Sequence, residues 1–469
     1  MKGEPLPIVI QGGMGFAIST WKLARTVSLN GGLGTLSGVA LDKVLALQLQ
    51  EGDKEGDLRR AASHFPFPHV ADMVFKEFFI EEGNPRGKKP RGIPVFTVSP
   101  PPLLIALSIL GNFIYVWLAK EGHEFPISIN YLEKIQMPHI YSIVGAMLAG
   151  VDYITVGAGI PRQIPKVINA ILEGKKVEYK IAIEGIKKDD YVTMSFDPVA
   201  FLGGKLPCMK KPRFLPIVAS NTLAELLSVR IPKDDLFGFV IEKPTAGGHN
   251  APPRGKPIFS ESGEPIYGTR DIVDYKEIQR LGFPFWIGGS TASPESLLSA
   301  MEAGAEGIQV GTAFALCEES GLDPALKRIV KAMAYRGELV VRTDPLASPT
   351  GYPFKVAQIP GTLSDKSVYE NRKRSCALCV LRTLYRRKDG SIGYRCPSEP
   401  VESYVRKGGR KEDTVGRQCV CSGLMDAAGF GHSPAIITIG DDVNRLMPIL
   451  MRHPYDTYAV RNVFEYHGL

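Results

Sequence analysis

The sequence lacks the features that mark several large classes of protein. It contains no short-period repeat and no low-complexity tract, so neither a repeat array nor a compositionally biased chain is expected. The N-terminal residues MKGEPLPIVI offer no secretory signal, because an acidic residue and two prolines interrupt the apolar part. No Gly-x-Gly-x-x-Gly motif opens a helix after a strand, which argues against a dinucleotide cofactor. We expect a cytoplasmic protein.

Net charge is also scarce over most of the chain. The formal charge of all 469 residues is +7, yet residues 372–421 alone hold 13 Lys or Arg against 5 Asp or Glu. The other 419 residues are therefore close to neutral. The same window contains five of the seven cysteines. A composition so different from its surroundings predicts a separate, basic, cysteine-rich module.

One segment has no charged residue at all. Residues 103–119 read LLIALSILGNFIYVWLA, which is near the lower limit of length for a membrane span. Ser108, Gly111 and Asn112 interrupt the run, and Ser-Pro-Pro-Pro precedes it in place of a basic flank. These properties favour a buried helix, with a single membrane span as the alternative.

Short apolar runs that end in glycine-rich loops recur along the chain. We expect eight strands, at 6–10, 33–37, 126–130, 151–156, 215–219, 237–241, 283–287 and 308–310. Several are followed by helical patterns, so the order of strand, loop and helix predicts a parallel α/β fold, a (β/α)8 TIM barrel. A doubly wound open sheet is the alternative.

The barrel is expected over residues 1–345 and a C-terminal extension over 346–469. Residues 39–125 and 174–213 do not follow the barrel rhythm and are interpreted as insertions.

Three consecutive strand ends carry the residues best suited to hold and transform a ligand. They read EKPTAGGH at 242–249, FWIGGS at 285–290 and GIQVGTAF at 307–314. Glycine lets backbone amides approach a ligand closely, and amides left free before a helix suit a phosphate. The expected phosphate cradle is therefore formed by the second and third loops. The alternative is that these glycines only permit tight strand-to-helix turns.

His249 directly follows two glycines at a strand end. A histidine there is a candidate proton carrier, because its ordinary pKa of about 6.5 makes both forms accessible at neutral pH. The alternative is a loop histidine bonded to the backbone.

These motifs resemble the nitronate monooxygenase (2-nitropropane dioxygenase-like) family, which also contains FMN-dependent enoyl-acyl-carrier-protein reductases. The likeness covers roughly residues 5–345 and rests on five segments in the family's order: PIVIQGGMG (7–15), NGGLG (30–34), AGGH (246–249), GG (288–289) and QVGTAF (309–314).

The resemblance implies a β/α barrel that holds FMN noncovalently, with His249 as the active-site acid/base. The cofactor-binding residues that it implies are Gly13, Met14, Gly15, Asn130, Ala246, Gly247, Gly248, Gly288, Gly289, Ser290, Gln309, Gly311 and Thr312. One departure is Thr245, which stands where the family commonly has glutamate.

The expected function is that of an FMN-dependent oxidoreductase of the nitronate monooxygenase type. It would oxidise a small substrate by proton abstraction and electron transfer to the flavin. Fold and flavin do not fix the substrate. The alternatives are reduction of an enoyl thioester and, from another class, a binding protein that keeps the barrel as a scaffold.

The cysteine-rich module predicts a metal site. Its candidate ligands are Cys376, Cys379, Cys396, Cys419 and Cys421, and four thiolates suffice for tetrahedral zinc or for an iron–sulfur cluster. Structural zinc, an iron–sulfur cluster that feeds electrons to the flavin, and unligated thiols all stay open. Few large apolar residues lie in this window, so a metal crosslink would replace a core.

The basic residues of the module suggest an acidic partner, either RNA or a phosphopantetheine carrier. Tyr385, Tyr394 and Tyr404 are interleaved with them. The alternative is a solvated basic face. The sequence leaves the oligomeric state open.

Overall fold

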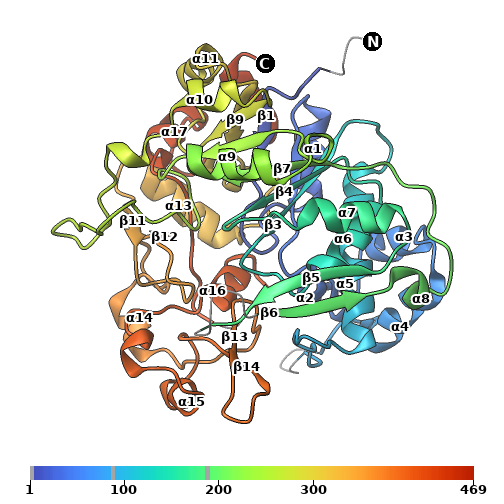
Figure 1. The fold of residues 1–469 in the computed structure, drawn as a ribbon. Helices are drawn as coiled ribbons and strands as arrows, with labels where there is room; N and C mark the ends of the chain where they lie inside the picture. Colours follow the sequence, from blue (N-terminus) through green and yellow to red (C-terminus); the bar gives the residue numbers. More distant parts are fainter. Residues whose placement is uncertain (1–4, 86–89, 185–190, 432) are drawn as a thin grey trace.

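A ring of eight parallel strands forms the centre of the protein (Figure 1). The computed structural model describes residues 5–85, 90–184, 191–431 and 433–469. In order round the ring, the strands are β1 (Val9–Gln11), β10 (Gly307–Val310), β9 (Phe285–Gly288), β8 (Phe239–Glu242), β7 (Arg213–Val218), β4 (Tyr153–Gly157), β3 (Ile127–Leu132) and β2 (Gly34–Ser37).

A short parallel pairing of Ile10 with Leu33 joins β1 to β2 and closes the ring. The backbone N–H of Leu33 donates to Val9 O at 2.9 Å, and that of Gln11 donates to Leu33 O at 3.0 Å. The predicted (β/α)8 barrel is confirmed, with each of its eight strands within a few residues of the expected position. The open sheet is excluded.

Large side chains fill the inside of the ring toward the N-terminal ends of its strands. This cluster consists of Ile10, Leu33, Tyr153, Leu215, Val240 and Trp286. Trp286 is fully buried, and its indole N–H donates to Pro7 O at 2.7 Å. Because this end is filled, the free space lies at the carboxyl ends of the strands, where barrel enzymes place their active sites.

Helices surround the ring and connect its strands. They are α1 (Trp21–Leu29), α5 (Pro102–Lys120), α6 (His139–Leu148), α7 (Ile164–Leu172), α9 (Asn221–Arg230), α10 (Tyr275–Arg280), α11 (Pro294–Glu302), α12 (Thr312–Ala315) and α13 (Pro324–Tyr335). Several begin at a side-chain cap: Thr20 caps α1, Ser220 caps α9 and Ser293 caps α11, each accepting a backbone N–H of the first turn.

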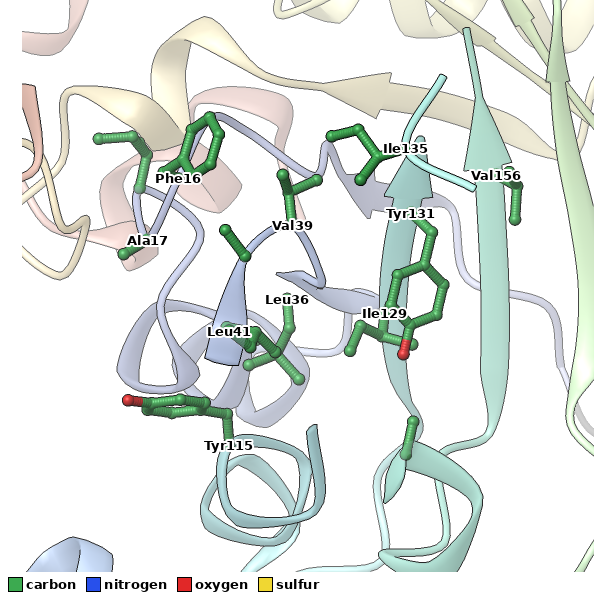
Figure 2. Packing of buried hydrophobic residues seen from close by; sticks show 14 of the residues in the cluster. Phe16, Ala17, Leu36, Val39, Leu41, Tyr115, Ile129, Tyr131, Ile135 and Val156 are labelled. Carbon is green, nitrogen blue, oxygen red and sulfur yellow. The ribbon is translucent and has the colours of Figure 1, made fainter. Parts of the chain in front are cut away.

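The uncharged segment forms α5, which packs against α1 and α6 in the position of the helix between β2 and β3. Helices α2 (Leu41–Gln50), α3 (Asp57–Ser63) and α4 (Pro68–Phe78) cover its other side. Figure 2 shows Leu36 and Leu41 between Tyr115 of α5 and Ile129 of β3. In the described residues α5 is the helix long and apolar enough to cross a membrane, but 83% of its apolar window is buried. A helix with apolar residues on every face is stable when other elements cover every face. The expected buried helix is therefore confirmed.

The second irregular segment contains an antiparallel hairpin and a short helix. The hairpin pairs β5 (Val177–Ala182) with β6 (Tyr191–Phe196), and α8 (Pro198–Leu202) follows it. Beyond β5, Glu184 N donates to Leu384 O at 2.8 Å, which attaches the hairpin to the C-terminal extension.

The C-terminal extension returns to the barrel. Its elements are β11 (Val341–Asp344), β12 (Phe354–Ala357), α14 (Lys366–Asn371), β13 (Thr383–Arg386), β14 (Ile392–Arg395), α15 (Val401–Arg406), α16 (Val420–Ala427), α17 (Val443–Leu450) and α18 (Val460–His467). Helix α17 packs against α13 (Figure 1). Helix α18 contacts α1 and α11. The predicted domain limits stay a prediction, but the extension is in contact with the barrel at both α17 and α18.

We expect Gly145→Ala in α6 to destabilise the protein by about 1–3 kcal/mol, because helices α5 and α6 cross at this residue. A Cβ there would lie 2.0 Å from Ile109 O, a backbone atom that can move only with its helix. Helix propensity alone would favour alanine by about 1 kcal/mol, so the sign of the change separates the two effects. Urea unfolding measures it. Gly268→Ala is the control, because a Cβ at that residue meets nothing within 4 Å. Equal or higher stability of Gly145→Ala would contradict the close crossing.

Candidate functional site

A cavity opens at the carboxyl ends of the barrel strands and gathers the sequence-predicted residues. Those that line it are Gly13, Met14, Gly15, Asn130, Ala246, Gly247, Gly248, His249, Gly289, Ser290, Gln309, Gly311 and Thr312. Gly288 is the predicted residue outside this lining; it ends β9 and pairs with Glu242 and Gln309 of the neighbouring strands. The structure thus places all but one of the predicted side chains round a single space. Their roles stay predictions.

The loop after β1 is held against the loop after β10. Gly12 N donates to Val310 O at 2.8 Å, and Ser19 Oγ donates to Gly12 O at 2.9 Å. Glycine is required at residue 13, because a Cβ there would lie 2.2 Å from the Cβ of Asn130. This contact fixes the position of Asn130 at the cavity wall.

Two polar groups on this wall have unmet hydrogen-bonding capacity. Asn130 Oδ1 and Gln309 Nε2 are buried and lack a partner among the described residues. One is an acceptor and the other a donor, and both residues line the cavity. Buried polar groups are almost always satisfied, so the pair indicates a ligand with both a donor and an acceptor.

The loops after β9 and β10 have the backbone expected of a cradle. Gly289 has a φ of +98° and Ser290 a φ of +51°, a left-handed conformation that is uncommon for a residue with a side chain. A Cβ at Gly289 would lie 3.0 Å from Lys243 O, so a larger residue would push this loop away from the loop after β8. Thr312 Oγ1 accepts the N–H of Gly440 at 2.9 Å and remains free to donate.

His249 is held by a serine and an aromatic ring. Its Nε2 lies 2.7 Å from Ser348 Oγ, and Ser348 Oγ lies 2.8 Å from Thr350 Oγ1. The ring packs edge-to-face on Phe354 with centroids 4.8 Å apart. Burial, assisted by the charge of Lys134, holds the pKa of His249 well below its ordinary value. The imidazole is therefore neutral at neutral pH.

Two further titratable groups lie near His249. Burial raises the pKa of Glu242, at the end of β8, to about 7, although Lys134 opposes the shift. Burial lowers the pKa of Lys134, which follows β3, to about 7, opposed by Glu242. The Lys134 Nζ lies 3.5 Å from the centroid of the Tyr352 ring and has no hydrogen-bond partner among the described residues. Sequence reasoning missed both groups as site residues; their place directly after a barrel strand was the available signal.

The C-terminal extension supplies part of the cavity wall, which sequence reasoning also missed. The residues that it contributes are Phe354, Leu381, Val420, Leu424, Thr438, Ile439, Gly440 and Asp442. Gly248 N donates to Thr438 Oγ1 at 2.6 Å, and a Cβ at Gly247 would lie 2.9 Å from the carbonyl carbon of Ile439. Two of the glycines before His249 therefore serve contact with the extension as well as with a ligand.

The predicted metal site is not supported. In the described part of the chain, no three His, Cys, Asp or Glu side chains are placed to hold a metal ion. The Sγ atoms of Cys376 and Cys379 lie 3.7 Å apart, but Cys379 Sγ donates to Cys376 O and Cys419 Sγ donates to Ser422 Oγ. Cys396 and Cys421 are buried free thiols, and burial raises the pKa of Cys421.

Arginine side chains hold the module together through hydrogen bonds to backbone carbonyl groups. Arg372 donates to Arg417 O at 2.9 Å, Arg374 to Thr414 O at 2.9 Å, and Arg382 to Phe96 O at 2.8 Å. Arg417 donates to Leu346 O at 2.8 Å and also to Ser348 O. The sequence predicted that these basic residues form a surface for an acidic partner. Several of them instead donate hydrogen bonds to backbone carbonyl groups within the protein.

Comparisons with known proteins agree with this fold and with the motifs. No family model matches the chain. A probable nitronate monooxygenase from Staphylococcus saprophyticus is 34% identical over 88 residues, which is 18% of this chain and 23% of that protein. The match thus spans about a quarter of the curated relative's length. It confirms the resemblance to the nitronate monooxygenase family that the motifs indicate.

The solved structure of FabK from Thermotoga maritima superposes with a TM-score of 0.50 and 16% identity, over 98% of this chain and 91% of that chain. A nitroalkane oxidase from Streptomyces ansochromogenes superposes with a TM-score of 0.47 and 12% identity, over 99% and 95% of the two chains. The FabK superposition agrees with the barrel fold, and at 16% identity it leaves the reaction to be argued from the site.

We expect the imidazole of His249 to stay neutral as the pH falls through its ordinary pKa of about 6.5, because burial disfavours the charged form. Histidine NMR titration measures this, with the signal assigned by its loss in His249→Gln. Lys134→Met should raise the pKa of His249, because it removes a nearby positive charge. Lys256→Met, an exposed lysine in the loop after β8, should not. A His249 signal that titrates at or above pH 6.5 in the unmodified protein would overturn this picture.

Proposed function

We propose that the chain is an FMN-dependent oxidoreductase of the nitronate monooxygenase type, with its active site in the cavity at the barrel mouth. The observation that carries the proposal is that the unpaired acceptor of Asn130 and the unpaired donor of Gln309 belong to residues that line the same cavity. The edge of a flavin ring offers both donors and acceptors. Bound FMN would supply the acceptance and return of electrons.

The chain's own residues would divide the remaining tasks. Asn130 and Gln309 would orient the ring, and the backbone at Gly289, Ser290 and Gly311 would bind the phosphate. His249, neutral and held by Ser348, would take a proton from the carbon next to the substrate's activating group. The wall from the extension, including Leu381 and Leu424, would exclude water from this space.

A spectrum of the purified protein, followed by anaerobic substrate addition, tests the proposal. Yellow protein that releases FMN, and that is bleached by the anion of 2-nitropropane, supports it. Bleaching by reduced nicotinamide and reoxidation by an enoyl thioester would instead favour the reductase alternative. Colourless protein that takes up no flavin would refute both.

Ser290→Asp should lower the FMN content several-fold, because it places a carboxylate where the phosphate is expected to bind. The ratio of flavin absorbance to protein absorbance measures the FMN content of each variant. Ser299→Asp is the matched control, with the same substitution on the exposed face of α11. Equal FMN content in the two variants would contradict phosphate binding at this loop. Extraction of FAD would refute FMN as the cofactor.

His249→Gln should retain FMN while kcat/KM falls by on the order of 10²–10⁴, the usual loss when a positioned acid or base is removed. Stopped-flow reduction of the flavin measures the chemical step. His453→Gln, in an exposed histidine paired with Asp456, controls for the loss of an imidazole. Rates within a few-fold of the unmodified protein across pH would return His249 to a structural role.

A further inference from the structure

A second cavity lies beside the first and is built by segments outside the simple barrel. Its volume is about 280 Å³. Its walls come from the first insertion, the loop after β3, the end of the β5 strand and the cysteine-rich module. The lining residues are 40, 42, 43, 96, 134–138, 181–184, 378–380 and 382–384. Most of the wall side chains are apolar, including Met137, Ile183 and Leu384.

The two cavities lie next to each other and share a lining residue. Ile135 lines both of them, and Figure 2 shows it above β3 next to Val39, which lines the first. In the module, Leu381 faces the first cavity while its neighbours Val380 and Arg382 face the second. A ligand in the second cavity would therefore lie close to one in the first.

The charged groups of the second cavity are matched, except for one. Lys43 Nζ lies 3.4 Å from Asp42 Oδ2, and Glu184 is paired with Arg395 at 3.2 Å. Arg382 donates to the backbone of Cys379 and Phe96. By contrast, the buried Nζ of Lys134 has no hydrogen-bond partner among the described residues and faces the ring of Tyr352.

We propose that this cavity binds the apolar chain of an amphiphilic substrate whose anionic oxygen pairs with Lys134. Apolar walls favour the chain, and an anion beside Lys134 would supply the partner that the buried amine lacks. The inference rests on the proposed function in one respect, that the head of this substrate faces His249. The proposed substrate class is an anion that carries an apolar chain, in place of a small nitroalkane anion.

The electrostatics near Lys134 agree with an anion at this place. Glu242 and His249 are the titratable groups that influence it from β8 and the following loop. Burial lowers the pKa of Lys134 to about 7. An anionic ligand would raise that pKa again, so its binding should take up protons above pH 7.

Binding of straight-chain carboxylates from butanoate to dodecanoate to the purified protein tests the proposal. Calorimetry should show affinity rising about fourfold for each added methylene, the value for burying one in an apolar space, until the cavity is full. Longer chains should then gain nothing. Affinity that is independent of chain length, or that keeps rising through dodecanoate, would overturn the proposal.

Two variants locate the chain and the anion. Val380→Trp should fill the cavity and move the plateau to shorter chains, whereas Val405→Trp, an exposed residue of the same module, should not. Lys134→Met should weaken every chain length by about 10- to 100-fold while keeping the increment per methylene, because it removes a charge-assisted hydrogen bond. If Val380→Trp and Val405→Trp behave alike, the chain is not in this cavity. If Lys134→Met binds normally, the amine is not its anion contact.

These measurements distinguish failure of the inference from failure of the proposed function. The carboxylate series requires no flavin and no turnover, and FMN content is determined separately in each variant. Colourless protein that shows the expected dependence of affinity on chain length would refute flavin binding and support the second cavity as a binding site. Yellow, active protein without that series would refute the cavity alone.

Discussion

Closure of the sheet between β1 and β2 is the constraint on which the rest of the structure depends. Leu33 makes it with two backbone hydrogen bonds, one to Val9 and one from Gln11. The closed ring has no free edge, so all strand ends point their loops into one space. That is why Gly13, near the start of the chain, touches Asn130, and why Gly12 is bonded to Val310.

Burial of charge gives the site its chemical character. Glu242, Lys134 and His249 lie in a region with little water, and in each case burial is the largest cause of the pKa shift toward the neutral form. Glu242 and Lys134 therefore gain or lose a proton near neutral pH, whereas His249 stays neutral there. Such groups suit a reaction in which a substrate proton moves while electrons leave or arrive.

The barrel could be predicted because its signals are local. Each strand is a short apolar run, and its glycine loop follows directly, as at Gly288-Gly289-Ser290. The burial of Lys134 has no such signal, because it depends on Tyr352, more than 200 residues away in the sequence. The same holds for Thr438, which contacts Gly248. The cysteine spacing predicted a metal site, but local thiol-to-oxygen hydrogen bonds occupy two of these sulfurs.

The contribution of residues 438–442 has a consequence for synthesis on the ribosome. A chain emerges from its N-terminal end, and domains ordinarily fold in that order as they emerge. Here Gly440 bonds to Thr312 and Thr438 to Gly248, so this wall of the cavity is completed only when residues 438–442 have left the exit tunnel. The eight strands all precede residue 311 and can close earlier. A nascent chain thus has its barrel before it has its complete pocket.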